Sequence, residues 1–324
     1  MKEIIVKAND ANQRLDKFLF KSFDALPSSL LYKAVRTKRI KCNGKRAQIS
    51  TRLCEGDVIT IYLNDDVLTP AKPKYEFLSA PVTLDIVYED ENLILVNKPE
   101  GLVVHPDDKE YRDTLIFRIQ HYLYEKQEYQ PDQEQSFKPA LVNRIDRNTG
   151  GIVIAAKNAE ALRILNEKLK LREIDKYYLC LVHGKPKKES DILEARLTKD
   201  TDKNQVTVKT GRHAEGQLIR TQYECLASDR TCSLLKIKLL TGRTHQIRAH
   251  LAYIGNPLVG DGKYGINKQD KKQGYAHQAL WSYRLSFSFQ SPAGILDYLN
   301  GRTFRVNNVW FVTERFPFIH LDTI

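Results

Sequence analysis

The sequence predicts a mixed α+β fold with a largely antiparallel sheet and a small additional domain at the N-terminus. From about residue 81, strand-like segments are joined by turns too short for a helical crossover, which indicates antiparallel pairing. Segments with helical periodicity lie between some of these strands. The first 64 residues follow a different pattern, because two short amphipathic helices precede a hairpin.

The length of 324 residues is compatible with about two domains. The content of 42% hydrophobic and 28% charged residues is typical of a globular protein, and the apolar runs fall short of the roughly 20 residues that cross a bilayer. The N-terminus lacks the continuous apolar stretch of a signal peptide. We therefore expect a cytoplasmic protein without membrane association.

Cysteine content and net charge narrow the functional classes. The five cysteines are odd in number and no two form a Cys-x-x-Cys pair, which argues against structural zinc and a disulfide framework. The net charge of +11 favours a polyanionic partner, since Lys and Arg gain affinity for phosphate backbones through counterion release. Many basic proteins do not bind nucleic acid, so the distribution of the charge matters more than its sum.

Residues 1–64 are expected to form the N-terminal domain. Its first helix is indicated by apolar residues at helical spacing, namely Leu15, Phe18, Leu19 and Phe23. Ser28 or Ser29 could cap a second helix. Asn43-Gly44 is a hairpin turn signal, and the alternating residues 58–63 follow it as a strand.

A run of cations without an acid crosses the end of the second helix and the hairpin. It consists of Lys33, Arg36, Lys38, Arg39, Lys41, Lys45 and Arg46. Together with "RLDKFL" and "GDVI", this basic segment resembles the small alpha-L RNA-binding domain. The resemblance implies that the patch binds RNA, and the alternative is a merely basic surface.

A linker at 65–80 and one larger domain at 81–324 are expected to follow. In this domain Asp146 lies in a turn before a short buried strand, and Asn158 can cap the next helix. A surface turn accepts Asp for ordinary reasons, but a loop supported by regular elements is also a common place for a catalytic group. The polar segment 121–140 is expected to be an exposed loop beside this site.

Residues 242–265 contain a second candidate element, a helix that Thr244 could cap and Gly255 could close. Arg248 lies early in this helix, where the macrodipole disfavours a cation, so we expect a specific anionic partner. His245 and His250 have no acid or Cys at ligand spacing, so we expect hydrogen-bonding roles and no metal site.

Residues 176–184, "KYYLCLVHG", form a third candidate element, a strand with two adjacent tyrosines. Alternation places Tyr178 with Cys180 on one face and Tyr177 with Leu179 on the other. One tyrosine is therefore expected in the core, and the other could face a cleft.

Four segments of the chain, in order, resemble the successive motifs of the RluA-type pseudouridine synthases, in particular of an RluC-like branch. They are "NKPEGLVVHP" at 97–106, "NRIDRNTGG" at 143–151, "KYYLCLVHG" at 176–184 and "GRTHQIRAHLAYIGNPLVGDGKYG" at 242–265. Enzymes of this family isomerise uridine in RNA to its carbon-linked form. The aspartate motif departs from the usual His-Arg-Leu-Asp-x-x-Thr-Ser-Gly at Asn143, Ile145 and Gly150.

The resemblance implies a pseudouridine synthase catalytic domain and assigns a role to each candidate residue. Asp146 would be the catalytic nucleophile, Tyr178 would stack on the target base, and Arg144 would help to displace that base. Arg248 would hold Asp146 charged and fixed through a bidentate pair. No cofactor is implied, and the expected partner is RNA, in particular 23S ribosomal RNA of the large subunit. The sequence does not determine the oligomeric state, and a monomer is favoured.

Two other functions remain open from the sequence. A catalytically silent RNA-binding or ribosome-assembly protein could keep the same fold, although it would have no need of Asp146, Tyr178 and Arg248 together. A nucleosidase or glycosylase would use a similar carboxylate, although no second acid is placed to activate water. The C-terminal segment 301–324 has strand-like character and no assigned role.

Overall fold

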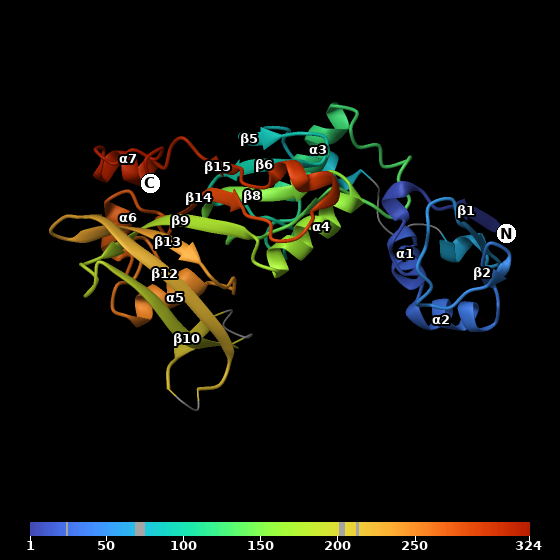
Figure 1. Ribbon diagram of the computed structural model, residues 1–324, viewed down its shortest axis with the longest axis horizontal. Helices are drawn as coiled ribbons and strands as arrows, with labels where there is room; N and C mark the ends of the chain where they lie inside the picture. The colour runs from blue at the N-terminus through green and yellow to red at the C-terminus, as the bar shows by residue number, and fades with distance from the viewer. Residues whose placement is uncertain (24, 69–74, 201–204, 212–213) are drawn as a thin grey trace.

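The computed structural model describes residues 1–23, 25–68, 75–200, 205–211 and 214–324. A small N-terminal unit lies at one end of the molecule, and a larger body built on one long sheet makes up the rest (Figure 1). The expected linker at 65–80 falls partly outside the described residues. On either side of that gap, Leu68 and Phe77 are buried in two different cores. No described helix is long and apolar enough to span a membrane.

The N-terminal unit packs two helices against a four-stranded sheet of order β1-β4-β2-β3. Its elements are β1 (Lys2–Ile5), η1 (Ala8–Asp10), α1 (Leu15–Ser22), α2 (Ser28–Arg36), β2 (Ile40–Cys42), β3 (Lys45–Arg46), β4 (Val58–Ile61) and η2 (Asp65–Leu68). The predicted hairpin is confirmed, since Asn43 and Gly44 join β2 to β3 with φ values of 51° and 71°. The predicted serine cap is wrong, because α2 begins after Pro27 without a side-chain cap.

The larger body contains an 11-stranded sheet of order β11-β10-β12-β13-β9-β14-β8-β6-β5, with β7 beside β8 and β15 beside β14. Among the described strands only β8 and β14 pair in parallel, which confirms the mixed, largely antiparallel class. The strands are β5 (Ile86–Glu89), β6 (Leu93–Lys98), β7 (Ala140–Leu141), β8 (Gly150–Ala156), β9 (Ile174–His183), β10 (Ser190–Asp200), β11 (Gln205–Lys209), β12 (Gln217–Ser228), β13 (Cys232–Leu239), β14 (Leu280–Phe287) and β15 (Thr303–Arg305).

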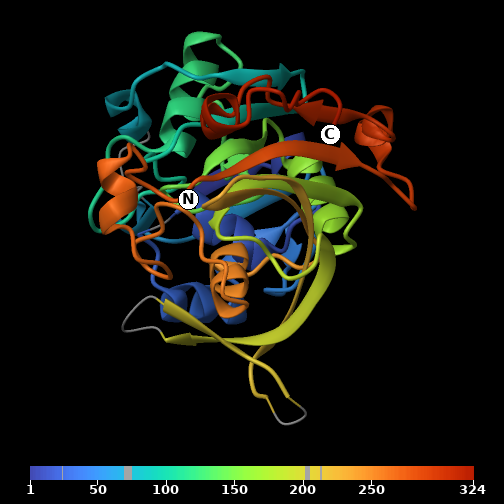
Figure 2. The same cartoon turned by 90° about the vertical axis from the view of Figure 1, so that its left-hand side faces the viewer.

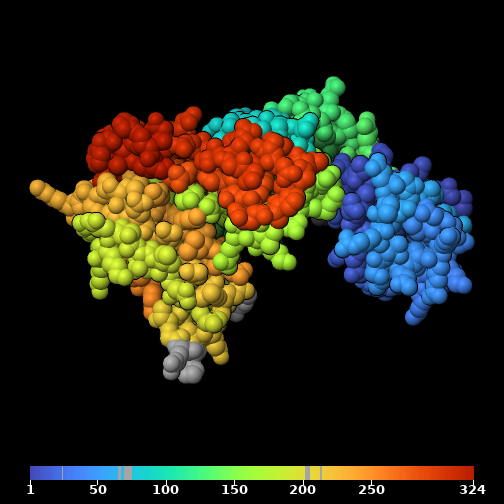
Figure 3. All heavy atoms as spheres, in the orientation of Figure 1, coloured from blue at the N-terminus to red at the C-terminus, as the bar shows by residue number. Residues whose placement is uncertain are grey.

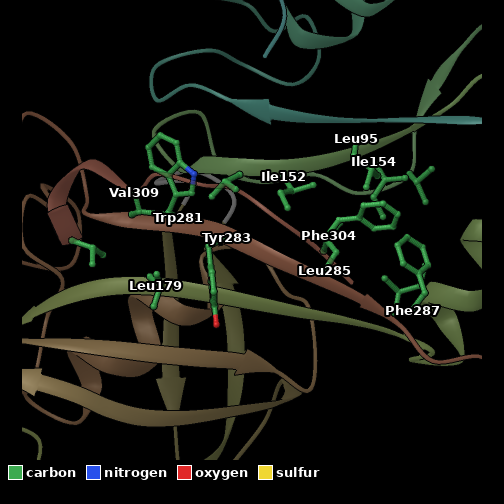
Figure 4. Close-up of a cluster of buried hydrophobic side chains, with 14 of the residues drawn as sticks. Leu95, Ile152, Ile154, Leu179, Trp281, Tyr283, Leu285, Phe287, Phe304 and Val309 are labelled. Atoms are coloured by element: carbon green, nitrogen blue, oxygen red, sulfur yellow. The ribbon is translucent and has the colours of Figure 1, made fainter. Parts of the chain in front are cut away.

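Helices cover both faces of this sheet and bury a separate core on each. Figure 4 shows part of one core, where Leu179, Tyr283 and Leu285 lie among apolar side chains. Strand β9 contributes to both, since Tyr178 and Cys180 face the other core, as the alternation predicts. The helices are η3 (Glu76–Ser79), α3 (Leu115–Glu125), α4 (Ala159–Lys170), α5 (Gln246–Tyr253), α6 (Lys268–Lys272), η4 (Gly294–Leu299) and α7 (Trp310–Arg315).

One end of the sheet, formed by β11, β10 and β12, extends away from the body (Figure 2). Its inner face forms a small core with α5 and Tyr264. This core anchors the projecting strands next to the helix that carries Arg248. The C-terminal segment 301–324 has strand character only in β15, and α7 is helical, so the strand expectation holds for a small part of it.

The segment 121–140 differs from the prediction. Its first residues complete α3, and residues 133–136 contact the N-terminal unit, where the two lobes meet (Figure 3). The buried carboxylate of Asp10 accepts a hydrogen bond from the Ser136 amide at 3.0 Å, and Tyr129 is also buried. The expectation of an exposed loop beside Asp146 is therefore wrong, because this segment joins the two lobes instead.

Candidate active site

The four predicted site residues line one cavity of about 540 Å³ in the larger body. Asp146 lies on the loop between β7 and β8, Tyr178 on β9 and Arg248 on α5. Arg144 is exposed at the cavity and has no carboxylate within 4 Å among the described residues. Segments far apart in the sequence thus bring an acid, an aromatic ring and two arginines together.

Hydrogen bonds from Lys98, the last residue of β6, fix the loop that carries Asp146. Lys98 is fully buried, and its Nζ donates to the carbonyls of Arg147 at 2.8 Å, Leu102 at 2.8 Å and Pro99 at 2.7 Å. The Thr149 amide also donates to the Asp146 carbonyl at 3.1 Å, which closes a turn. Sequence reasoning missed the role of Lys98, although the residue lies in the motif at 97–106.

Two residues that depart from the usual aspartate motif, Gly150 and Asn143, contact specific neighbours. A Cβ atom at Gly150 would lie 2.3 Å from the ring of Trp281, so the indole fills the space that a larger residue would need. Trp281 Nε1 donates to Asn97 Oδ1 at 3.1 Å, which fixes the ring. Asn143 is buried, and its Oδ1 accepts from the Ile154 amide at 2.8 Å. Both residues therefore support β8, the strand that follows the loop.

Arg248 joins two carboxylates. Its Nη1 lies 2.8 Å from Asp146 Oδ2, whereas Nε and Nη2 lie 2.7 Å and 2.9 Å from the two oxygens of Asp261. The expected anionic partner is present, but the expected bidentate geometry with Asp146 is wrong, since that geometry occurs with Asp261. Sequence reasoning missed Asp261, although it lies within the motif at 242–265.

Burial and charge shift the pKa values of Arg248 and Asp261 in opposite directions. Burial alone would lower the pKa of Arg248, but the hydrogen bonds and negative charges of Asp261 and Asp146 raise it. Burial alone would raise the pKa of Asp261, but the Arg248 guanidinium and backbone amides lower it. The side chain of Asp261 is 0% exposed and that of Asp146 is 26% exposed, so Asp146 is the carboxylate that faces the cavity.

The two tyrosines of β9 have different surroundings. Tyr178 lines the cavity, and burial raises the pKa of its phenol to about 12. Tyr177 lies on the other face, where the Arg284 guanidinium is 4.0 Å from its ring centre. Tyr178 is therefore the tyrosine that shares the cavity with Asp146.

His245 also approaches Asp146, with Nε2 3.8 Å from Oδ2. It precedes α5 in a left-handed conformation with φ of 53°, and the predicted Thr244 cap is wrong. His250 Nδ1 is 3.0 Å from Thr221 Oγ1, a hydrogen-bonding role as expected. The described residues contain no group of three or more His, Cys, Asp or Glu that could hold a metal ion.

The remaining arginine of the motif at 143–151 and the cations of the N-terminal patch lie outside this group of residues. Arg147 pairs with the exposed Asp107 at 2.9 Å and takes no part in the cavity. The cations of the N-terminal patch are exposed apart from the partly buried Lys41: Lys33, Arg36, Lys38, Arg39, Lys45 and Arg46. No described carboxylate lies within 4 Å of any of them, which leaves their charge free for a polyanion.

A cavity with one accessible carboxylate and an aromatic wall, joined to a separate basic lobe, defines an enzyme that acts on nucleic acid. Comparison with known proteins identifies it further. The model of the RNA pseudouridylate synthase family matches residues 92–253, and that of the S4 domain matches residues 13–59. The chain therefore belongs to the RNA pseudouridylate synthase family and is an isomerase with an S4 domain, which confirms the resemblance of its motifs.

Individual relatives agree with this assignment. The chain is 35% identical to an uncharacterized RNA pseudouridine synthase of Mycoplasma genitalium, over 88% of each chain. It is 30% identical to the ribosomal large subunit pseudouridine synthase C of Haemophilus influenzae, over 95% of this chain and 91% of the relative. The solved human RNA pseudouridylate synthase domain containing 4 has the same fold, with a TM-score of 0.56, 21% identity and coverage of 74% and 94%.

Proposed function

We propose that this synthase isomerises uridines of large-subunit ribosomal RNA, with Asp146 as the catalytic nucleophile. The observation that supports the proposal most directly is the hydrogen bonding of the two Asp146 carboxylate oxygens. Arg248 holds its Oδ2, whereas Oδ1 accepts no hydrogen bond from the described residues. A fixed carboxylate with one free oxygen beside an aromatic wall is suited to covalent catalysis on a flipped nucleotide.

The reaction breaks the bond from ribose C1′ to N1 of the base and forms a bond from C1′ to C5. Asp146 Oδ1 can take up the ribose, add to the base or promote an elimination, and in each route it is the acting atom. Arg248 fixes the direction of the carboxylate, and Tyr178 keeps the detached base in place. Among the described residues that line the cavity, no second acid is available to activate water, which favours isomerisation over hydrolysis.

The target nucleotide must leave its stack to reach Asp146, at a cost of roughly a few kcal/mol. Arg144 is exposed at the mouth of the cavity and lacks an ion-pair partner among the described residues, so it can occupy the space that the base leaves. A stacked or hydrogen-bonded guanidinium there would offset part of the lost stacking energy.

The RNA backbone can follow a basic groove that adjoins the cavity. This groove has a volume of about 460 Å³ and shares Leu169, Lys176, Leu239, Gly242 and Arg243 with the cavity. Its other cations are Lys170, Arg172, Arg220 and Lys238. Phosphates in the groove would hold the strand next to the flipped nucleotide, while the S4 domain binds a more distant part of the RNA.

The choice of large-subunit ribosomal RNA rests on the names of relatives that match nearly the whole chain. Pseudouridines in ribosomal RNA can be mapped by carbodiimide-dependent primer extension in cells with and without this gene. We expect loss at defined uridines of large-subunit RNA, restored by the wild-type gene but not by Asp146→Asn. Unchanged ribosomal sites would refute the proposed substrate, and restoration by Asp146→Asn would refute the proposed nucleophile.

A further inference from the structure

Isomerisation of uridine also moves a proton, since C5 loses its hydrogen and N1 gains one. Once C1′ is bonded to C5, that carbon carries both the ribose and a hydrogen, and a base must remove the hydrogen. The product then needs a proton at N1. One group that accepts the proton from C5 and returns it to N1 balances the reaction without any further reactant.

We propose that His245 is this proton carrier, a catalytic residue additional to Asp146. Its Nε2 is 3.8 Å from Asp146 Oδ2, and its ring lines the same cavity. The inference rests on the proposed function, because C5 meets C1′ beside the Asp146 carboxylate. Nε2 therefore lies on the side of the cavity where C5 must arrive.

The backbone conformation of His245 and its contact with Tyr264 fix the position of its ring. Its φ of 53° is unusual for a residue with a side chain, and such strained conformations are concentrated at functional sites. Nδ1 lies 2.9 Å from Tyr264 Oη, and the two rings meet edge to face. Tyr264 Oη is held in turn, since it accepts a hydrogen bond from the Val206 amide at 3.0 Å.

These contacts engage Nδ1 and leave Nε2 without a hydrogen-bond partner among the described residues. In the tautomer with its proton on Nδ1, His245 donates to Tyr264 Oη and directs the Nε2 lone pair into the cavity. At 3.8 Å from Asp146, Nε2 is beyond hydrogen-bond distance, so the carboxylate does not occupy that lone pair. Proton uptake at Nε2 gives an imidazolium beside Asp146, and this occurs as the ribose leaves the carboxylate charged again.

Lys176 also lines the cavity and burial lowers its pKa, but it forms no ion pair with Asp146 within 4 Å. Tyr178 and the arginines of the cavity are poorer proton acceptors at neutral pH. Burial raises the pKa of Tyr178 to about 12, so its phenol stays protonated. Arg144, Arg243 and Arg248 are permanent cations. Burial lowers the pKa of His245 despite the negative charges of Asp146 and Asp261, and the cations Arg248 and Lys263 lower it further. His245 is therefore neutral and able to accept a proton.

The test compares two substrates that differ at C5. Large-subunit ribosomal RNA transcripts are prepared with 5-tritiated uridine or with 5-fluorouridine, because fluorine cannot leave as a proton. We expect His245→Gln to slow tritium release by about 100-fold or more, the usual size of an acid–base contribution. The same variant should consume 5-fluorouridine at the wild-type rate, since bond cleavage and C5 attachment precede the step that His245 serves. Asp146→Asn should lose both activities.

The outcomes separate this inference from the proposed function. Equal losses on both substrates at an unchanged melting temperature would overturn it, since His245 would then only position Asp146. Unchanged tritium release would also overturn it. If the melting temperature of His245→Gln falls, tritium release is measured instead for His245→Ala with added imidazole. Restored release would then support a proton carrier, and its absence would refute one. A wild-type protein inactive on both substrates would instead refute the proposed function.

Discussion

Replacement of Arg248 by lysine separates the two carboxylates that the guanidinium joins. Arg248 contacts Asp261 through Nε and Nη2 and Asp146 through Nη1, whereas a lysine ammonium is a single point that cannot span both. An unpaired charge costs more where it is buried, and only Asp261 is fully buried. We therefore expect the ammonium of Arg248→Lys to stay with Asp261 and to leave Asp146 without its cation.

The contacts of Arg248 give the expected size of the change in the free energy of unfolding and of the change in turnover. The variant loses the hydrogen bond to Asp146 and at least one of the two to Asp261, and a net charge-assisted bond contributes about 1.5–3 kcal/mol. Because Asp146 is partly exposed, the free energy of unfolding should fall by about 2–4 kcal/mol in total. The lost bond to Asp146 should lower turnover by roughly ten- to hundredfold, if the whole bond acts in the transition state.

Urea unfolding gives the stability change, tritium release gives turnover, and filter binding gives RNA affinity, which we expect to stay close to wild type. Arg118→Lys is the matched control, because Arg118 forms a bidentate pair with Asp113 outside the cavity, at side-chain exposures of 19% and 39%. It should cost about 1 kcal/mol or less and leave turnover unchanged. Turnover of Arg248→Lys near that of the wild type would refute the role of Arg248 in holding Asp146.

Three other substitutions test the supports of the site. Lys98→Met removes a donor from three carbonyls, of which that of Arg147 keeps the Gly101 amide, and should lower the free energy of unfolding by at least about 2 kcal/mol in urea, whereas a loss below about 1 kcal/mol would contradict the support of the loop. Gly150→Ser, which restores the usual residue, should cost about 1–3 kcal/mol by overpacking against Trp281, and a melting temperature equal to wild type would speak against this clash. Arg172→Glu should weaken RNA binding and reduce the salt slope by about one, unlike Lys271→Glu outside the groove; equal effects would remove the groove as the RNA path.

The parts of the fold that sequence predicted are those set by local patterns. Asn158 caps α4 through a hydrogen bond from the Ala161 amide, because Asn stabilises a free helix N-terminus wherever one occurs. The two faces of β9 follow from alternation alone, and the turn at Asn43-Gly44 follows from the ease of positive φ there. Each of these features depends on residues within one or two turns of the chain.

The features that sequence did not predict depend on distant partners. Sequence reasoning did not single out β14, which carries Trp281 and lies in the sheet between β8 and β9. Thr244 resembles a cap, but the left-handed His245 takes the position before α5 and turns toward Tyr264. Local propensity cannot report a contact with a residue that only tertiary structure brings near.

The pairing of Arg248 with Asp261 explains how the site can hold Asp146, the proposed nucleophile, by a single bond. If Asp146 made a bidentate pair, both of its oxygens would be occupied, and attack would require that pair to open first. Asp261 instead fixes the guanidinium from a fully buried position, so Nη1 is directed at Asp146 Oδ2 before RNA arrives. The cost of ordering Arg248 is met during folding, and Oδ1 of Asp146 stays free of protein hydrogen bonds within the described structure. Asp261 therefore positions Asp146 through Arg248 without lining the cavity itself.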